Sequence, residues 1–212
     1  MSELSIYETL RNAGLTAEGA CGLMGNMMAE SSMKANIAQR GLTKLSDEEY
    51  TKRFDAEPVI YRSDAVGYGL CQWTYWTRKR DLWDFAHARG KSVGDENTQV
   101  LFCLKELREQ YNGLFGFLCT TKDIYSAAER VCKEFERPAI NNIAPRYAFA
   151  VDFFEKLAEP SSPDVTPDFP PDLSIMLLQA VLNYNNYACK INGYKDKEFL
   201  TQLREFVTDL GG

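Results

Sequence analysis

Residues 20–32 read A-C-G-L-M-G-N-M-M-A-E-S-S, and they form the centre of a predicted helix that begins near Thr16. Apolar side chains recur at intervals of three or four residues, which places them on one helix face: Leu23, Met24, Met27 and Met28. Glu30 follows Leu23 by seven positions, almost two full turns, so its carboxyl projects from the same face. Poor solvation and the negative end of the helix dipole both disfavour the charged form of such a group. The pattern therefore predicts a proton-bearing carboxyl suited to general-acid chemistry. The alternative is a last turn that reaches water and leaves Glu30 solvated and idle.

Three glycines in this helix favour the first interpretation. Gly19, Gly22 and Gly25 lie three residues apart, and each costs up to about 1 kcal/mol relative to alanine in a helix interior. This repeated cost indicates that another backbone or a ligand approaches the helix closely.

Length and composition limit the class of protein. The chain has 212 residues, enough for one domain and a small appendage, and its net charge is −6. Lysine and arginine form no run interleaved with aromatic residues, so we expect no nucleic-acid partner. No apolar stretch is long enough to span a membrane, and the first five residues predict no signal peptide.

The six cysteines are expected to be reduced, because Cys21, Cys103 and Cys132 fall within apolar helical patterns and none belongs to a C-x-x-C pair. With His87 as the only histidine, the cysteine spacings predict no zinc site. No metal or other cofactor is expected.

The chain is predicted to be mainly α-helical, with a small irregular or β region, an α+β arrangement. Residues 1–158 form the main domain, residues 159–171 a proline-rich linker, and residues 172–212 a small helical module. The S-x-x-E sequences at Ser5 and Ser46 resemble capping boxes. Val59, Ile60 and Tyr61 favour an extended segment. Further helices are expected over residues 77–89, 95–111, 121–136 and 145–158.

Residues 67–74, G-Y-G-L-C-Q-W-T, predict a loop or small hairpin whose glycines allow close approach of a ligand. Tyr68, Trp73, Tyr75 and Trp76 supply aromatic faces of the kind that pack on sugar rings, and the Gln72 amide can hydrogen-bond hydroxyl or acetamido groups. The alternative is a hairpin tucked into the core with its aromatic side chains buried. Residues 78–80, R-K-R, are typical of a solvated helix face.

Several of these segments together resemble the phage tail lysozyme family of peptidoglycan hydrolases over residues 3–158. The resemblance rests on residues 22–31 with Glu30, on residues 67–74, on Arg78-Lys79 with Leu82, and on Phe135-Glu136-Arg137-Pro138 with the later Arg146. It implies a lysozyme-like fold with Glu30 as the catalytic acid. It also implies that Ser31, Tyr68, Gln72 and Trp73 lie in the glycan cleft. Residues 177–183, 191–194 and 206 resemble part of a peptidoglycan-binding module.

The reaction implied by this resemblance is cleavage of the β-1,4 bond between N-acetylmuramic acid and N-acetylglucosamine in bacterial peptidoglycan. Such enzymes usually work with two carboxyl groups. Asp64 is the first candidate for the second carboxyl group, because it precedes the glycine loop and can position water. Asp55 and Glu57 are less favoured candidates. Alternatively, the acetamido group or the 6-hydroxyl of the muramic acid itself attacks the sugar carbon C1, and a second carboxylate is then not required. The residues do not separate hydrolysis from lytic transglycosylation.

The biological setting follows from the resemblance and from the expected lack of a signal peptide. We expect a phage or prophage endolysin that reaches the wall through a holin-type pore, or a tail-associated lysin. In either case the protein is made in the host cytoplasm and acts on the cell wall. Two other classes stay open: a non-catalytic peptidoglycan-binding protein, and a wall peptidase that uses Cys71 or Cys21 with His87.

Overall fold

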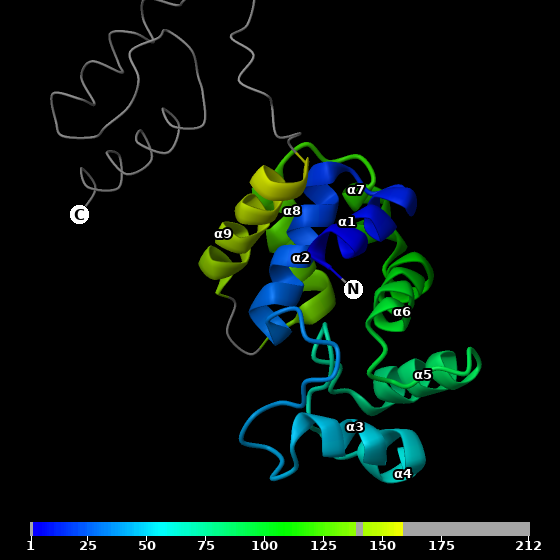
Figure 1. The fold of residues 1–212 in the computed structure, drawn as a ribbon. Coiled ribbons are helices and arrows are strands. Elements are labelled where there is room, and N and C mark those ends of the chain that lie inside the picture. Colours follow the sequence, from blue (N-terminus) through cyan, green and yellow to red (C-terminus); the bar gives the residue numbers. More distant parts are fainter. Residues whose placement is uncertain (1, 139–141, 159–212) are drawn as a thin grey trace, which may run out of the picture. The chain divides into compact units, whose positions relative to one another are not determined.

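The computed structural model describes residues 2–138 and 142–158, so the predicted linker and C-terminal module lie outside the described residues. The described part is mainly helical, as expected (Figure 1). It contains α1 (Glu3–Asn12), α2 (Ala17–Ser31), α3 (Asp47–Ala56), α4 (Pro58–Tyr61), α5 (Trp76–His87), α6 (Glu96–Gln110), α7 (Asn112–Leu118), α8 (Ile124–Arg130) and α9 (Ile143–Phe153). Helices α8 and α9 continue into π-helical turns, η1 (Val131–Glu136) and η2 (Phe154–Ala158).

Side-chain caps start the helices near the predicted places, with one correction. The hydroxyl of Thr16 accepts a hydrogen bond from the Gly19 amide at the start of α2, and Ser46 caps α3 in the same way. The first helix begins earlier than predicted, because Ser2 rather than Ser5 provides its cap. Residues 59–61 are not extended: Pro58, in the first turn of α4, has the fixed φ that suits a helix start.

Helix α2 is the central element of the described domain, and α1, α8 and α9 lie around it (Figure 1). Its three glycines are where neighbouring backbones come closest. A Cβ atom on Gly19 would lie 2.1 Å from the carbonyl oxygen of Leu118 in α7. On Gly22 it would lie 2.5 Å from Ala127 Cβ in α8, and on Gly25 it would lie 2.4 Å from the Arg146 carbonyl oxygen in α9. The close partner predicted from the glycine spacing is therefore protein backbone.

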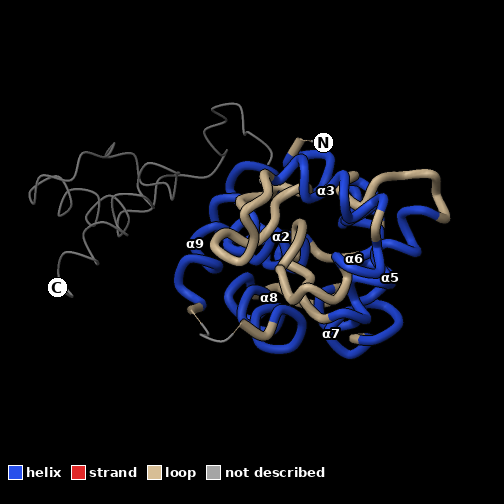
Figure 2. The backbone as a smooth tube through the Cα atoms, turned by 90° about the horizontal axis from the view of Figure 1, so that it is seen from below, coloured by secondary structure: helices blue, strands red, loops and turns tan. Residues whose placement is uncertain are grey.

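Residues 67–74 form the predicted small hairpin within a long run of loop (Figure 2). The Tyr68 and Trp73 backbones exchange two hydrogen bonds, of 3.2 and 2.9 Å. Gly69 sits between them at φ +75°, a left-handed conformation that favours glycine. Both aromatic side chains point into the core and are fully buried.

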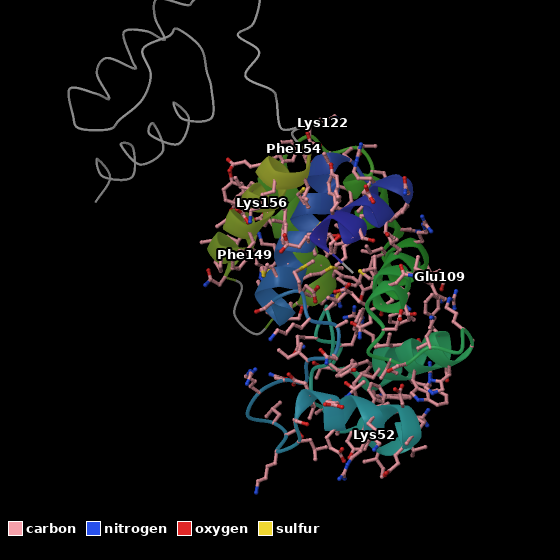
Figure 3. The ribbon with its side chains drawn as sticks, in the orientation of Figure 1. Lys52, Glu109, Lys122, Phe149, Phe154 and Lys156 are labelled. Carbon is pink, nitrogen blue, oxygen red and sulfur yellow. The ribbon has the colours of Figure 1, made fainter. Side chains whose placement is uncertain are left out.

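The outer surface of the described domain carries many charged side chains. Lys52, Glu109, Lys122 and Lys156 project from it in Figure 3, and all four are exposed. None of the described helices is long and apolar enough to cross a membrane.

Replacement of Gly25 by alanine tests the close contact between α2 and α9. Alanine raises intrinsic helix propensity, but its methyl group would overlap backbone atoms of α9. We expect Gly25→Ala to lower the free energy of unfolding by about 2–4 kcal/mol in urea titrations. Gly116→Ala in α7 is the matched control, because a Cβ there meets no atom within 4 Å, and it should be neutral or slightly stabilising. Equal stability of the two variants would contradict this packing.

Candidate active site

An open cleft of about 780 Å³ runs beside the C-terminal end of α2. Its walls come from the end of α2, the loop before α3, the hairpin, the start of α5, the residue after α6, and the end of η1. The lining residues are Glu30, Gln39, Leu42, Ala65, Cys71, Gln72, Thr74, Tyr75, Arg78, Tyr111, Phe135, Glu136, Arg137 and Pro138.

Glu30 lies in this cleft and is held by an arginine from another helix. Its Oε1 atom accepts a hydrogen bond of 2.6 Å from Nη2 of Arg146, and 19% of the Glu30 side chain is exposed. The other terminal nitrogen of Arg146 donates to Oδ1 of Asn26, at 3.1 Å. Asn26 in turn donates to the carbonyl oxygens of Gly22 and Ala128. This network joins α2, α8 and α9 and sets the direction of the Glu30 carboxylate.

Glu136, the last residue of η1, places a second carboxyl group on the same cleft. Its Oε1 atom is buried and has no hydrogen-bond partner among the described residues. Burial raises the pKa of Glu136 to about 8, and the negative charge of nearby Glu30 acts in the same direction. Arg78, Arg146 and the Cys71 thiol oppose this rise without cancelling it. Glu136 therefore carries a proton at neutral pH.

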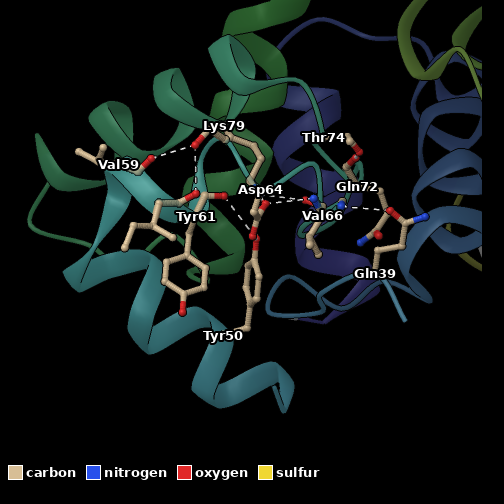
Figure 4. Close-up of polar contacts among 12 residues, drawn as sticks. Gln39, Tyr50, Val59, Tyr61, Asp64, Val66, Gln72, Thr74 and Lys79 are labelled. Carbon is tan, nitrogen blue, oxygen red and sulfur yellow. Dashed lines mark hydrogen bonds and ion pairs between the residues drawn. The ribbon is translucent and has the colours of Figure 1, made fainter. Parts of the chain in front are cut away.

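Asp64, the predicted second carboxylate, is not among the cleft-lining residues. Its Oδ1 atom accepts a 2.7 Å bond from Nζ of Lys79, and its Oδ2 atom accepts one of 2.7 Å from the Tyr50 hydroxyl (Figure 4). The Val66 amide also donates to Asp64. Lys79 is completely buried, so residues 78–80 are not a uniformly solvated face. Through these contacts Asp64 neutralises the charge of a buried lysine. A catalytic role for Asp64 stays a prediction.

The other predicted glycan contacts divide into two groups. Gln72 lines the cleft, at a positive φ of 45°, with its amide nitrogen bonded to the Gly69 carbonyl oxygen. Tyr68 and Trp73 are buried in the core, and Ser31 is buried with its hydroxyl bonded to the Met27 carbonyl oxygen. For Tyr68 and Trp73, the alternative of a hairpin with its aromatic side chains buried describes what is observed.

Trp73 is held in the core by a hydrogen bond to the buried carboxylate of Glu106, which also pairs with Arg78. The indole nitrogen of Trp73 donates to Glu106, at 2.7 Å, and Arg78 forms two further bonds to the same carboxylate. Arg78 also lies over the Phe135 ring, 4.6 Å from its centroid. This arrangement ties the hairpin and α5 to α6 behind the cleft.

The environments of Cys71 and Cys21 do not favour the thiolate form that a nucleophilic cysteine requires. Burial raises the pKa of the Cys71 thiol, and it raises that of Cys21 to about 12, so neither forms a thiolate readily. His87 stacks on Trp83 with ring centroids 3.8 Å apart and does not line the cleft. The described cysteines form no disulfide with one another. Within the described ranges, no group of three or more His, Cys, Asp or Glu side chains is arranged to hold a metal ion.

The mainly helical domain, with a glutamate at the end of its central helix facing an open cleft, has the arrangement expected of a lysozyme-like domain. The family model of the phage tail lysozymes matches residues 2–157. The chain therefore belongs to the phage tail lysozyme family and is a phage lysozyme-type peptidoglycan hydrolase. No curated protein matches the chain.

Glu136 is the site residue that reasoning from the sequence did not single out. The segment Phe135-Glu136-Arg137-Pro138 carries part of the family resemblance, yet helical spacing places Glu136 beyond the apolar pattern of residues 124–135. The available signal was a glutamate directly after an aromatic side chain, Phe135, at the end of a predicted helix.

Asp64→Asn tests whether Asp64 has a structural role. Removing the charge leaves Lys79 buried without its counter-ion, so we expect the free energy of unfolding to fall by about 2–4 kcal/mol. Glu49→Gln, which breaks an exposed pair with Arg53, should leave stability nearly unchanged in the same thermal and urea measurements. A stable Asp64→Asn protein that has lost all activity would instead support a catalytic Asp64.

The raised pKa of Glu136 predicts a specific dependence of stability on pH. Between the ordinary value of 4.5 and about 8, the folded protein holds a proton on Glu136 that the unfolded chain has released. Unfolding then releases a proton, so stability falls as pH rises through this window, and the loss is complete above about pH 8. Relative to Glu136→Gln, the wild type should lose on the order of 5 kcal/mol between pH 4.5 and 9. A constant stability difference between the two proteins over this range would exclude the shift.

Proposed function

We propose that this protein is an N-acetylmuramidase, a lysozyme that cleaves the β-1,4 bond between N-acetylmuramic acid and N-acetylglucosamine, with Glu30 as the general acid. The observation that carries the proposal is the Glu30 carboxyl, which is partly buried, faces a cleft and is held in one direction by Arg146. Leaving-group protonation requires a carboxyl fixed in this way beside the glycosidic oxygen.

The cleft has features that suit a polymer of sugars. It is open, so a long strand can lie across it, and Gln72 and Gln39 supply polar groups on its walls. Tyr75, 64% exposed, and Trp76, 48% exposed, line an adjoining hollow of about 340 Å³. In our proposal these exposed rings, rather than Tyr68 and Trp73, pack against the faces of the sugars.

The family also supports a phage setting for this activity. We propose that the protein works as a phage or prophage endolysin or as a tail-associated lysin, made in the host cell and acting on its wall. A holin-type pore in the first case, or the phage tail in the second, would bring it to its substrate.

Digestion of purified peptidoglycan by the full chain tests the proposed reaction. We expect the wild type to release disaccharide-peptides with a reducing-end muramic acid, detected by mass spectrometry. Glu30→Gln, which keeps the shape but removes the proton donor, should release them at least about 100-fold more slowly. Glu134→Gln serves as the control, since this glutamate pairs with Arg130 outside the cleft.

Each other outcome of this digestion has a definite meaning. Products lighter by one water contain anhydro-muramic acid and identify a lytic transglycosylase. Free peptides, or no products from folded wild type, would contradict a glycosidase. Full activity of Glu30→Gln would reject Glu30 as the acid while leaving the glycosidase in place.

A further inference from the structure

We propose that Glu30 and Glu136 form a carboxyl pair that shares a single proton, and that this proton is the one delivered to the glycosidic oxygen. The inference rests on the proposed glycosidase activity and deepens it by naming the second carboxyl of the site. Glu136 takes the place that reasoning from the sequence assigned to Asp64.

Geometry supplies the first argument. Glu30 ends α2 and Glu136 ends η1, and both line the same cleft. Two carboxylates that face the same cleft repel each other, and the negative charge of Glu30 raises the pKa of Glu136. Below about pH 8, Glu136 therefore holds a proton beside Glu30.

The surrounding charges determine which member of the pair holds that proton before substrate binds. Arg146 donates directly to Glu30 through a charge-assisted bond of 2.6 Å. Glu136 has no comparable direct partner, and its buried Oε1 atom is without any hydrogen bond among the described residues. The proton therefore resides on Glu136, and Glu30 is its neighbour, oriented by Arg146.

The remaining groups that face Glu136 come from three other parts of the chain. Arg78 is close enough to lower the proton affinity of Glu136, but its guanidinium is already bonded twice to Glu106. Arg146, on α9, is shared with Glu30 and Asn26. Cys71, on the hairpin, is a further hydrogen-bonding neighbour, and burial keeps its thiol protonated. No cation on these elements is dedicated to Glu136.

The carboxyl pair can donate one proton during bond cleavage and recover one proton afterwards. The shared proton passes through Glu30 to the glycosidic oxygen as the bond between that oxygen and the sugar C1 breaks. The pair is then doubly negative at the moment when positive charge develops on the sugar ring, and this attraction offsets the repulsion between the carboxylates. Water adds to C1, or the muramic 6-hydroxyl closes on it, and the proton released by that group returns to the pair. Glu136 acts through Glu30 and is in this sense a positioning residue for the proton.

A titration without substrate tests the pair independently of catalysis. In the full chain labelled with ¹³C at glutamate side-chain carboxyls, NMR should show one carboxyl that titrates near pH 8. The signal should vanish in Glu136→Gln and persist in Glu134→Gln. In Glu30→Gln it should titrate at a clearly lower pH, because the neighbouring negative charge is gone. An ordinary titration of Glu136, or one that Glu30→Gln leaves unchanged, would overturn the pair.

The pH dependence of activity tests the delivery of the proton. The wild type should lose kcat/KM above about pH 8, where the pair loses its last proton. Glu136→Gln should be impaired at least about tenfold at pH 7 and should recover toward the wild type as the pH is lowered to 5, because solvent then supplies the proton that Glu136 normally holds. Glu136→Asp, which retains a carboxyl, should keep an alkaline limb near that of the wild type.

A Glu136→Gln activity that is a constant fraction of the wild-type activity from pH 5 to 8 would indicate a merely structural role and would overturn the proposal. If the wild type releases no disaccharide-peptides at any pH, the glycosidase itself fails, and the delivery step fails with it. The NMR titration still decides separately whether the two glutamates share a proton.

Discussion

Close contact between α2 and three neighbouring segments is the constraint on which the site depends. Gly19, Gly22 and Gly25 remove the side chains that would hold α7, α8 and α9 away, and the carbonyl oxygens of Leu118 and Arg146 occupy the space of the missing Cβ atoms. This contact brings Arg146 to Glu30 and brings the end of η1 to the same cleft. The cost of three glycines in one helix is thus balanced by packing that positions the two carboxyls.

Two buried charge clusters show how the rest of the domain supports the cleft. Lys79 is enclosed with Asp64, Tyr50 and the Val66 carbonyl oxygen, and it anchors the loop that precedes the hairpin. Glu106 gathers Trp73 and Arg78 and anchors the hairpin from behind. In both clusters the charges are paired and hydrogen-bonded, as buried ions must be. The Glu136 carboxyl, with an unpartnered buried oxygen facing the cleft, differs from these satisfied networks.

The hairpin illustrates how a correct local prediction can place side chains on the wrong surface. Glycine, aromatic and glutamine residues at 67–74 indicate a turn near a ligand, and Gln72, Thr74 and Tyr75 do line the cleft. The neighbouring Tyr68 and Trp73 pair across the hairpin and point the other way, into the core. The turn of the hairpin, with Gly69 and Gln72 at positive φ, produces this split, and local composition alone does not say which side chains meet solvent.

Local sequence patterns were sufficient to predict many of the described helices. The 3.6-residue period and the cap at Thr16 predicted the central helix and the place of Glu30 at its end, because both depend on contacts a few residues apart. The glycine spacing predicted that a backbone or a ligand approaches this helix, without saying which one. The family resemblance added the class of enzyme. Only the tertiary structure paired Asp64 with Lys79 and brought Glu136 and Arg146 to Glu30, since these contacts join residues 15, 106 and 116 positions apart in the sequence. Burial and charge at such sites arise from packing between distant segments, so the motifs that contain Glu136 and Arg146 did not by themselves show which side chains would meet.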